Sequence, residues 1–134
     1  MKIENIKFKA KRLDNGEWVY GSLTRSTAGV KERAYIVDSF SSMSDYSVIG
    51  VEPSTVCQFT GLKDCEGNEI WEGDVLLNAN SGSQYTVMYS DYGGAFFIRK
   101  KGTLNDDMYL FELFDIDKCI AFLEVICNKF DKEK

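Results

Sequence analysis

Runs of alternating apolar and polar residues, separated by turns that contain glycine, recur along the chain. In IKFKAKR the apolar Ile6, Phe8 and Ala10 alternate with lysines, and this two-residue period predicts a strand with one face in water. The following LDNGEW contains Asn15 and Gly16, a pair that readily adopts the positive φ of a tight hairpin. The chain is therefore expected to begin with a β-hairpin.

Further strand signals follow at short intervals. In EWVYGSL, Trp18 and Tyr20 would lie on one face and Val19 on the other. TRSTAGVKER lacks apolar periodicity and is expected to be a long connection before the strand RAYIVDSF, and VIGVEPSTVCQF gives two extended pieces broken at Pro53. QYTVMYS and GGAFFIRKK are two more strand candidates, split by the turn DYGG. About eight to ten short strands predict a mainly β fold, with at most one or two short helices.

Glycines and acidic residues crowd the central stretch QFTGLKDCEGNEIWEGDV, residues 58–75. Asp64 stands three residues before Gly67, as in a type I turn that leads into a bulged hairpin, and Gly73 marks a second turn before an apolar run. The spacing matches neither a phosphate loop nor a calcium loop. We therefore expect the acidic residues to flank turns and face water, without holding a ligand.

Two segments near the C-terminus carry a helical period as well as strand-forming residues. In NDDMYLFELF, residues spaced by three predict one or two helical turns: Met108, Phe111 and Phe114. In DKCIAFLEVICNKF, a helix would align Ile120, Leu123, Cys127 and Phe130, and a strand fits the same residues. Periodicity alone leaves helix and strand open for this last segment.

Size and composition indicate a folded protein of one domain or two small lobes, with 134 residues of which 44% are hydrophobic. The chain has no apolar run of signal-peptide or membrane-helix length, so we expect a cytosolic protein without membrane contact. In a reducing compartment the four cysteines, at 57, 65, 119 and 127, would stay thiols. Histidine and the Cys-x-x-Cys motif are absent, so no metal and no cofactor are expected.

Charge is unevenly distributed along the chain. Residues 1–33 hold eight Lys and Arg against four Asp and Glu, whereas residues 34–134 hold eight against seventeen. An acidic body repels phosphates, so nucleic-acid binding would depend on the basic N-terminal third. The candidate contact residues are Lys7, Lys9, Lys11, Arg12, Arg25, Lys31 and Arg33. The alternative is that the lysines form a solvated strand face that discourages edge pairing.

Catalysis finds little support in the residue types. Nucleophilic catalysis with a histidine base is closed to a chain without histidine. A carboxylate-based hydrolase is the remaining catalytic hypothesis, with Glu69, Glu72 and Asp74 close together in sequence. Carboxylates beside glycine turns are more commonly solvated, so hydrolysis ranks third among the functions considered, and no catalytic residue is assigned.

The order IKFKAKR, EWVYG, VEPSTVCQFTGLKDCEGNEIWEGDV and finally EVICN resembles the YopX-like proteins of bacteriophages and prophages. The resemblance runs over nearly the whole chain. It implies an N-terminal β lobe and a C-terminal half folded as an SH3-like barrel that begins near NEIWEGDV, and it implies no catalytic residues. The family usually has Tyr at the positions of Phe59 and Trp71, and Gly at the position of Cys127. A family glycine there favours a strand over a long terminal helix.

Together these observations predict a mainly β protein with an N-terminal β lobe at residues 1–57 and an SH3-like small β-barrel at residues 58–134. The favoured function is a non-enzymatic accessory protein of a phage or prophage in the bacterial cytoplasm, acting as a protein-interaction module. Its partner would be a second copy of the chain, in a homo-oligomer, or a host or phage protein. Nucleic-acid binding is the second hypothesis. The aromatic residues Trp18, Tyr20, Trp71 and Phe97 are expected to be mostly core.

Overall fold

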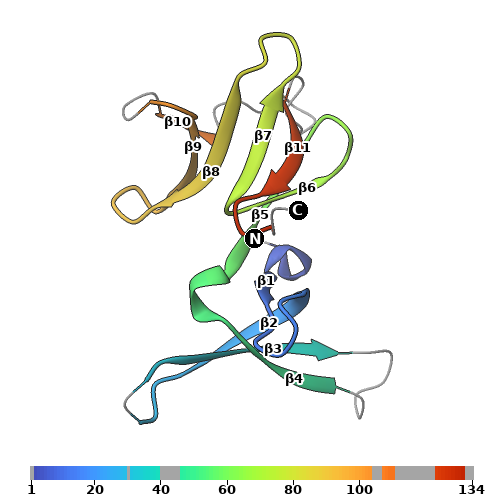
Figure 1. Ribbon diagram of the computed structural model, residues 1–134, viewed down its shortest axis with the longest axis vertical. Coiled ribbons are helices and arrows are strands. Elements are labelled where there is room, and N and C mark those ends of the chain that lie inside the picture. The colour runs from blue at the N-terminus through green and yellow to red at the C-terminus, as the bar shows by residue number, and fades with distance from the viewer. Residues whose placement is uncertain (1, 30, 40–45, 104–106, 111–122, 132–134) are drawn as a thin grey trace. The chain divides into compact units, whose positions relative to one another are not determined.

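The computed structural model describes residues 2–29, 31–39, 46–103, 107–110 and 123–131, and antiparallel strands dominate them (Figure 1). The elements in chain order are η1 (Ile3–Asn5), β1 (Phe8–Lys11), β2 (Trp18–Ser26), β3 (Arg33–Ser39), β4 (Tyr46–Val51), η2 (Pro53–Thr55), β5 (Cys57–Lys63), β6 (Glu69–Trp71), β7 (Asp74–Asn78), β8 (Gln84–Ser90), β9 (Ala95–Lys100), β10 (Asp107–Tyr109) and β11 (Leu123–Asn128). The mainly β prediction is confirmed, with eleven strands in the described residues where about eight to ten were predicted.

The chain divides into two compact units, Met1–Phe59 and Thr60–Lys134, which we call unit 1 and unit 2. The division falls within β5, whereas the boundary predicted from the sequence lies between residues 57 and 58. Among the described residues, no helix is long and apolar enough to span a membrane.

Unit 1 holds β4, β3, β2, β1 and the start of β5, which are neighbours in the antiparallel strand order β4-β3-β2-β1-β5-β6. The alternation read from the sequence is confirmed for Ala10, which is fully buried and pairs with Val19 of β2, but it is wrong for Ile6, which is 47% exposed. Around them lie the other buried core residues Ala34, Ile36 and Val51. The sheet curls back on itself, because Arg12 forms a bridge with Val51 and so joins the end of β1 to the end of β4.

The predicted long connection TRSTAGVKER is shorter than expected. Its first residues belong to β2, which continues to Ser26 and pairs with β3 through Arg25 opposite Ala34 and Ser26 opposite Arg33. Polar residues are drawn into the strand because β3 satisfies their backbone groups. Gly21, earlier in β2, is needed for a different reason: a Cβ there would overlap the backbone carbonyl of Val37.

Unit 2 contains a five-stranded antiparallel sheet in the order β10-β9-β8-β7-β11. Its core is formed by the buried side chains of Ile70, Leu76, Val87, Ile98, Leu110 and Leu123. Trp71, at an aromatic position of the YopX-like pattern, is buried, as is Phe59 in unit 1. The strand order does not establish an SH3-like barrel, so that part of the fold stays a prediction.

Most of the described residues of the C-terminal segments form strands. The helical prediction is wrong for Asp107–Tyr109, which form β10 and pair with β9. Phe111 and Phe114 lie outside the described residues. For the last segment the strand is confirmed: β11 pairs with β7, and its register shifts between Val125 and Cys127. This irregularity ends at the position where YopX-like proteins have glycine.

Candidate functional site

Lys9 and Lys11 of β1, and Lys7 just before the strand, lie against aromatic rings. The Nζ of Lys9 and the Nζ of Lys11 each lie 4.4 Å from the centroid of the Trp18 ring. The Nζ of Lys7 lies 4.6 Å from the Phe59 centroid. Lys9 is only 7% exposed, so the prediction of a solvated face is wrong for this residue. Its charge is stabilised over the aromatic faces of Trp18 and Tyr20 and is inaccessible to a phosphate.

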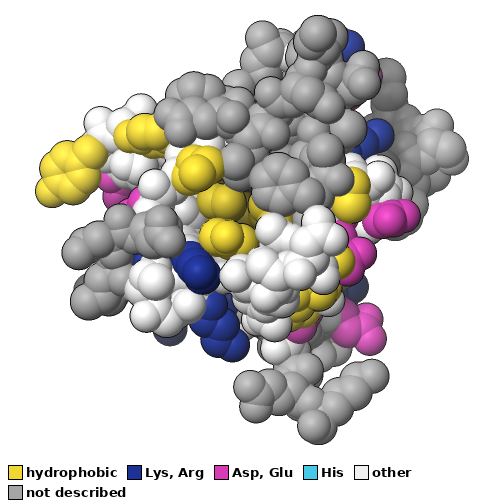
Figure 2. Space-filling view, turned by 90° about the horizontal axis from the view of Figure 1, so that it is seen from above, with side chains coloured by type: hydrophobic (Ala, Val, Ile, Leu, Met, Phe, Trp, Pro, Cys, Tyr) yellow, Lys and Arg dark blue, Asp and Glu magenta, His cyan; other side chains and the backbone are white. Residues whose placement is uncertain are grey.

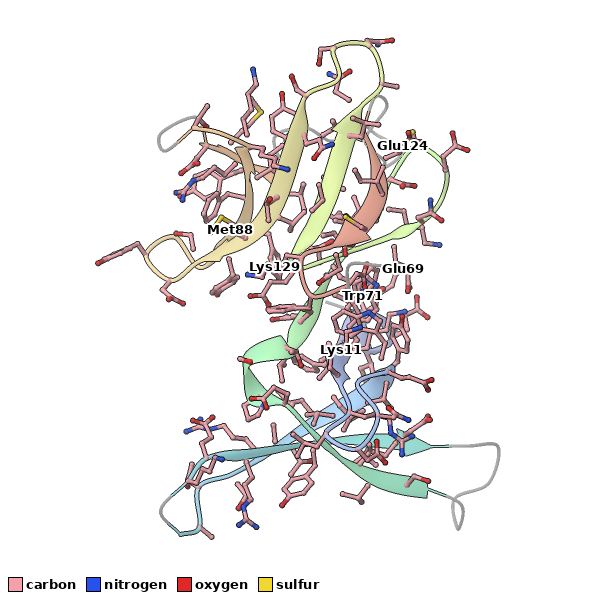
Figure 3. The ribbon with its side chains drawn as sticks, viewed as in Figure 1. Lys11, Glu69, Trp71, Met88, Glu124 and Lys129 are labelled. Atoms are coloured by element: carbon pink, nitrogen blue, oxygen red, sulfur yellow. The ribbon has the colours of Figure 1, made fainter. Side chains whose placement is uncertain are left out.

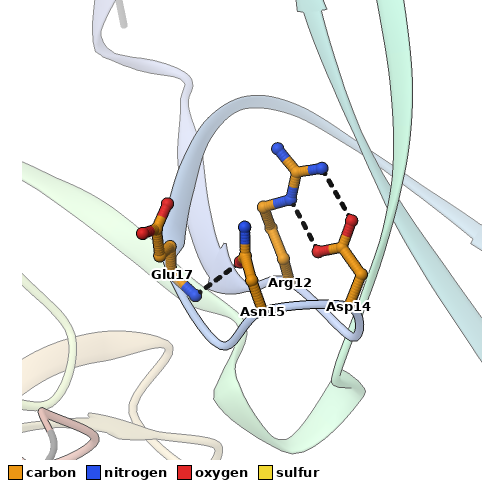
Figure 4. Close-up of polar contacts among 4 residues, drawn as sticks. All are labelled: Arg12, Asp14, Asn15 and Glu17. Atoms are coloured by element: carbon orange, nitrogen blue, oxygen red, sulfur yellow. Dashed lines mark hydrogen bonds and ion pairs between the residues drawn. The ribbon is translucent and has the colours of Figure 1, made fainter.

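Arg12 sits in the hairpin turn after β1, where its guanidinium is committed to a neighbour. Its Nε and Nη2 donate to the two carboxylate oxygens of Asp14 at 2.9 and 2.8 Å (Figure 4). This hydrogen bond and the charge of Arg12 hold the pKa of Asp14 below its usual range. The turn itself forms as predicted, with Gly16 at φ 73° and Asn15 Oδ1 accepting from the Glu17 N–H at 2.9 Å.

The other predicted basic residues lie at the far end of the β2–β3 hairpin. Arg25 makes an ion pair with Glu32 at 3.0 Å, and Lys31 and Arg33 are exposed beside it. Phe8 pairs with Gly21, so Arg25 lies four residues beyond β1, about 13 Å at roughly 3.3 Å per residue. The structure therefore separates the predicted basic residues into a group on β1 and a group at the hairpin end.

The central acidic residues do not all face water, and Asp74 shows why that expectation is wrong. Asp74 is buried; its Oδ2 accepts from the Trp71 N–H at 2.7 Å and its Oδ1 from Asn128 Nδ2 at 2.9 Å. Asn128 Nδ2 also donates to the Glu72 carbonyl at 3.1 Å. Glu69 is half-buried on β6, beside Trp71 in sequence (Figure 3). Both carboxylate oxygens of Asp74 thus accept hydrogen bonds that hold the 71–74 turn and the end of β11. Asp74 is therefore engaged in a structural role and does not fit the carboxylate cluster considered for hydrolysis.

Asp64 is the second buried carboxylate of this stretch, and it is 1% exposed. Its Oδ1 accepts from the N–H groups of Glu66 and Asn68 at 2.9 and 2.8 Å; its Oδ2 accepts from Asn68 Nδ2 at 3.1 Å and the Val125 N–H at 2.8 Å. Burial acts to raise its pKa, but these hydrogen bonds together outweigh burial and lower it. The predicted turn is confirmed, with Gly67 at φ 85°. The Asp64 carboxylate also joins this turn to β11, because it accepts from Val125, sixty-one residues away.

The cysteines and carboxylates of the described residues form no group of three or more that could hold a metal ion. Cys57 is buried and its thiol donates to the Thr55 carbonyl at 3.3 Å. Cys65 and Cys127 are exposed free thiols; partial desolvation and the charges of Asp64 and Glu66 raise the pKa of Cys65. Cys119 lies outside the described residues.

A groove of about 440 Å³ opens in unit 2 between the β8–β9 turn and the strands β9 and β10. We call it the aromatic groove, because its apolar lining is formed by Tyr89, Tyr92, Phe97, Met108 and Tyr109. Tyr92 is fully exposed at the tip of the turn, and Tyr89, Met108 and Tyr109 are more than a third exposed. Hydrophobic side chains are also seen grouped on the face of the molecule shown in Figure 2.

The shape of the aromatic groove is fixed by the glycine turn and by one ion pair. A Cβ on Gly93 would lie 2.6 Å from the Tyr109 hydroxyl, so a side chain at residue 93 would displace the Tyr109 ring from its present position against the turn. Arg99 donates from Nε and Nη2 to the Asp107 carboxylate at 2.7 and 3.0 Å, and its guanidinium lies 5.6 Å from the Phe97 centroid. This pairing lowers the pKa of Asp107 and joins β9 to β10.

Chemically, the aromatic groove is suited to receiving apolar groups. Its Ser90 hydroxyl accepts from the Gly93 N–H at 3.0 Å and so stabilises the turn, and a histidine base is absent from the whole chain. Its volume is in the range of typical ligand pockets, about 300–1,000 Å³. Exposed aromatic rings around a concave surface are a common feature of binding sites.

The sequence model of the YopX protein family matches residues 7–131 of the chain. The chain belongs to the YopX protein family. None of the curated proteins compared with this YopX family member matches it. The matched range covers both units and includes every residue of the aromatic groove.

The aromatic groove of this YopX family member is not evident from its sequence pattern. The turn predicted at DYGG is confirmed, but the sequence pattern does not predict that Tyr89 and Tyr92 line a binding surface. Phe97, expected to be core, is half-buried in the groove, and Tyr20 is half exposed. The available sequence signal for the groove was a hairpin turn with two glycines beside tyrosines. The lining residues that β10 contributes could not be read from the sequence, because they depend on strand pairing.

Proposed function

We propose that this YopX family member is a non-enzymatic protein-interaction module whose binding surface is the aromatic groove of unit 2. The observation that carries the proposal is the exposure of Tyr89, Tyr92 and Tyr109 around one concave surface. Tyr, Met and Arg are enriched in the energetically important parts of protein interfaces, and all three occur in this lining. Leaving large aromatic side chains in water is unfavourable unless a partner covers them.

The partner that fits best is a protein segment carrying an apolar or aromatic side chain next to a basic one. Unit 2 holds eight Lys and Arg against fourteen Asp and Glu, a net charge of −6, whereas unit 1 holds eight against seven. At the groove Arg99 is already paired with Asp107, and Asp91 is exposed on the turn. A basic side chain of the partner would therefore be attracted, and a phosphate backbone would be repelled.

A random-peptide display selection against the whole protein tests this function directly. We expect the selected peptides to share an apolar or aromatic residue beside Lys or Arg. Tyr109→Ala and Tyr92→Ala should each weaken the binding of a selected peptide about tenfold or more in calorimetric titration, as loss of an interface hot spot does. Tyr20→Ala, which removes a half-exposed aromatic ring from unit 1, is the matched control and should leave the affinity unchanged. Peptides that bind the groove variants as tightly as the wild type would overturn the proposal.

Self-association, viral origin and location complete the proposal. The resemblance to phage and prophage proteins supports a bacteriophage or prophage accessory protein working in the cytoplasm of its bacterial host. We further propose that the protein forms a homo-oligomer, since small β proteins with open strand edges commonly associate. Sedimentation velocity over a range of concentrations measures this, and a monomer at every concentration would contradict it. Fractionation of host cells that carry the gene tests the location.

Nucleic-acid binding is the second candidate, and one observation favours it: Lys31 and Arg33 are exposed together at the end of the β2–β3 hairpin. Phosphate contacts made there would weaken steeply with salt. Fluorescence anisotropy with single-stranded and duplex DNA at low salt measures such binding. We expect the wild type to show no DNA binding that the Lys31→Ala and Arg33→Ala double variant lacks. Salt-dependent DNA binding that the wild type shows and the double variant loses would favour this candidate over the first.

A further inference from the structure

The two strand orders leave four strands at sheet edges, and three of them carry features that discourage pairing with another chain. β6 and β10 have three residues each and begin with the charged Glu69 and Asp107. β11 carries Glu124 on an irregular register (Figure 3). The fourth, β4, reads YSVIGV: it has six residues, no charge, no proline and a continuous register with β3. Short length, charge and bulges are the usual ways in which proteins block sheet edges, and β4 has none of them.

Among the described residues, the chain itself covers the outer side of β4 only near the end of the strand. The Leu13 N–H donates to the Gly50 carbonyl at 3.1 Å, and the Glu52 N–H donates to the Lys11 carbonyl at 2.9 Å. Backbone groups alternate in direction along a strand, so the N–H and carbonyl of Val48 point the same way as those of Gly50, away from β3. In the described part of the chain, no backbone hydrogen bond covers β4 on that side before Gly50.

The side chains beside this open edge are apolar. Val48 is 58% exposed, and it stands opposite Val37, which is half-buried, in the pairing with β3. Leu13 is 64% exposed and its Cδ1 lies 3.6 Å from the position of a Cβ on Gly50. An open edge with an apolar surface beside it offers both hydrogen bonds and buried area to a pairing strand.

We propose that β4 pairs with β4 of a second copy, antiparallel and about a two-fold axis through Ser47. This inference rests on the homo-oligomer of the proposed function and assigns its interface to the edge of β4. Such a register places Val48 opposite Tyr46 of the second copy, where the outward N–H and carbonyl groups of the two residues exchange hydrogen bonds. It also ends the pairing before Gly50, where Leu13 covers the edge.

A second copy is the occupant that the charges favour. β4 is uncharged and unit 1 has eight positive against seven negative residues, so two copies approach each other there without strong repulsion. Contacts between two copies of unit 2 would bring together two surfaces of net charge −6. An identical strand also satisfies the requirement of a two-fold interface that the same patch serves both partners.

Cysteine crosslinking tests the register. Directly opposite residues of a non-hydrogen-bonded antiparallel pair have Cα atoms about 4.5 Å apart, within the span of a disulfide. Ser47→Cys should therefore form a covalent dimer rapidly under mild oxidation. Asp38→Cys is the matched control, because it pairs with Ser47 on β3 and lies one strand further from the axis. Both variants are made in a full-length chain in which the other accessible or undescribed thiols are replaced by serine: Cys65, Cys119 and Cys127.

A charge placed on the edge tests the same surface without covalent chemistry. Val48→Lys should raise the dissociation constant of the dimer about tenfold or more in sedimentation equilibrium, because the edge then carries a charge of the kind that blocks pairing. Thr24→Lys adds the same charge to an exposed position of β2, which β3 separates from β4, and should leave the constant unchanged. Circular dichroism confirms that each variant is folded before it is compared.

The outcomes separate this inference from the proposed function. Crosslinking of Ser47→Cys but not Asp38→Cys, together with dissociation by Val48→Lys alone, supports pairing through β4. Equal crosslinking of both cysteines, or an oligomer that Val48→Lys leaves intact, overturns the β4 pairing while self-association itself stands. A wild-type monomer at all concentrations overturns both, and peptide binding by the aromatic groove is then measured independently.

Discussion

Replacing Asp64 by asparagine removes half of the hydrogen bonds that this buried side chain accepts. Asparagine keeps an oxygen for the N–H groups of Glu66 and Asn68 within the turn. At the other position it presents an NH₂ group to two donors, Asn68 Nδ2 and the Val125 N–H. The clamp between the turn and β11 is therefore lost, while the turn itself is retained.

The magnitude follows from these two contacts. A hydrogen bond to a charged acceptor contributes about 1.5–3 kcal/mol, so two contacts set an upper value of about 6 kcal/mol. Asn68 is exposed, and its side chain can turn toward water at little cost. In the variant, the half-buried Val125 N–H faces the NH₂ group of the new asparagine and loses its hydrogen-bond acceptor. We expect Asp64→Asn to lower the free energy of unfolding of unit 2 by about 3 kcal/mol.

Urea denaturation followed by tryptophan fluorescence measures this change, because each unit holds one tryptophan, Trp18 in unit 1 and Trp71 in unit 2. In a Trp18→Phe background the signal reports the unit that contains Asp64. The pKa of Asp64 is lower in the folded than in the unfolded chain, so its stabilising effect is complete above the ordinary pKa of about 4 and is lost as the pH falls through the folded pKa. The difference between the wild type and Asp64→Asn should therefore shrink under acid conditions.

The matched control is Asp91→Asn, which removes an exposed carboxylate from the β8–β9 turn and should change stability by less than about 0.5 kcal/mol. A cost for Asp64→Asn below about 1 kcal/mol would refute the reasoning, because it would mean that the clamp contributes no more than an ordinary neutral hydrogen bond. A difference from the wild type that stays constant from neutral to strongly acid pH would refute the assignment of the effect to the ionised carboxylate.

Three further predictions concern other contacts. Gly21→Ala should destabilise unit 1 by about 2 kcal/mol or more in thermal unfolding, because the added Cβ meets the Val37 carbonyl and the backbone has to shift; a smaller change would contradict the close approach of β2 to β3. Asn128→Ala should cost unit 2 about 2–3 kcal/mol in urea denaturation, since it removes the donor to a buried carboxylate. In an NMR pH titration the pKa of Asp107 should lie below the usual range and rise in Arg99→Gln, and an unchanged pKa would show that the ion pair does not form in solution.

Much of the local structure could be predicted because it depends on neighbouring residues. Gly16 and Gly67 have positive φ in the turns expected of them, and Pro53 interrupts two strands at the expected place. The alternation around Ala10 and Val19 identified the buried face of the first hairpin. These features follow from the backbone preferences of single residues and from the two-residue period of a strand, so the sequence carries them directly.

The aromatic groove was harder to predict from the sequence, because strand pairing brings its separate segments together. The turn and its tyrosines were visible in the sequence, but Met108 and Tyr109 join them only after β10 pairs with β9. The helical period of that segment pointed the other way. Pairing with an existing strand satisfies the backbone of Asp107 to Tyr109 and adds the ion pair to Arg99, and a short isolated helix offers neither.

The sequence by itself determined that this YopX family member is a mainly β chain, where its hairpins turn, and which strand faces are apolar. Only the tertiary structure decided the fate of its charged residues. Lys9 was expected in water and is buried over Trp18, and Asp64 and Asp74 were expected at the surface and are buried with their hydrogen bonds satisfied. The reason is that the burial of a charge depends on partners from distant segments, such as Val125 and Asn128, which no local pattern specifies.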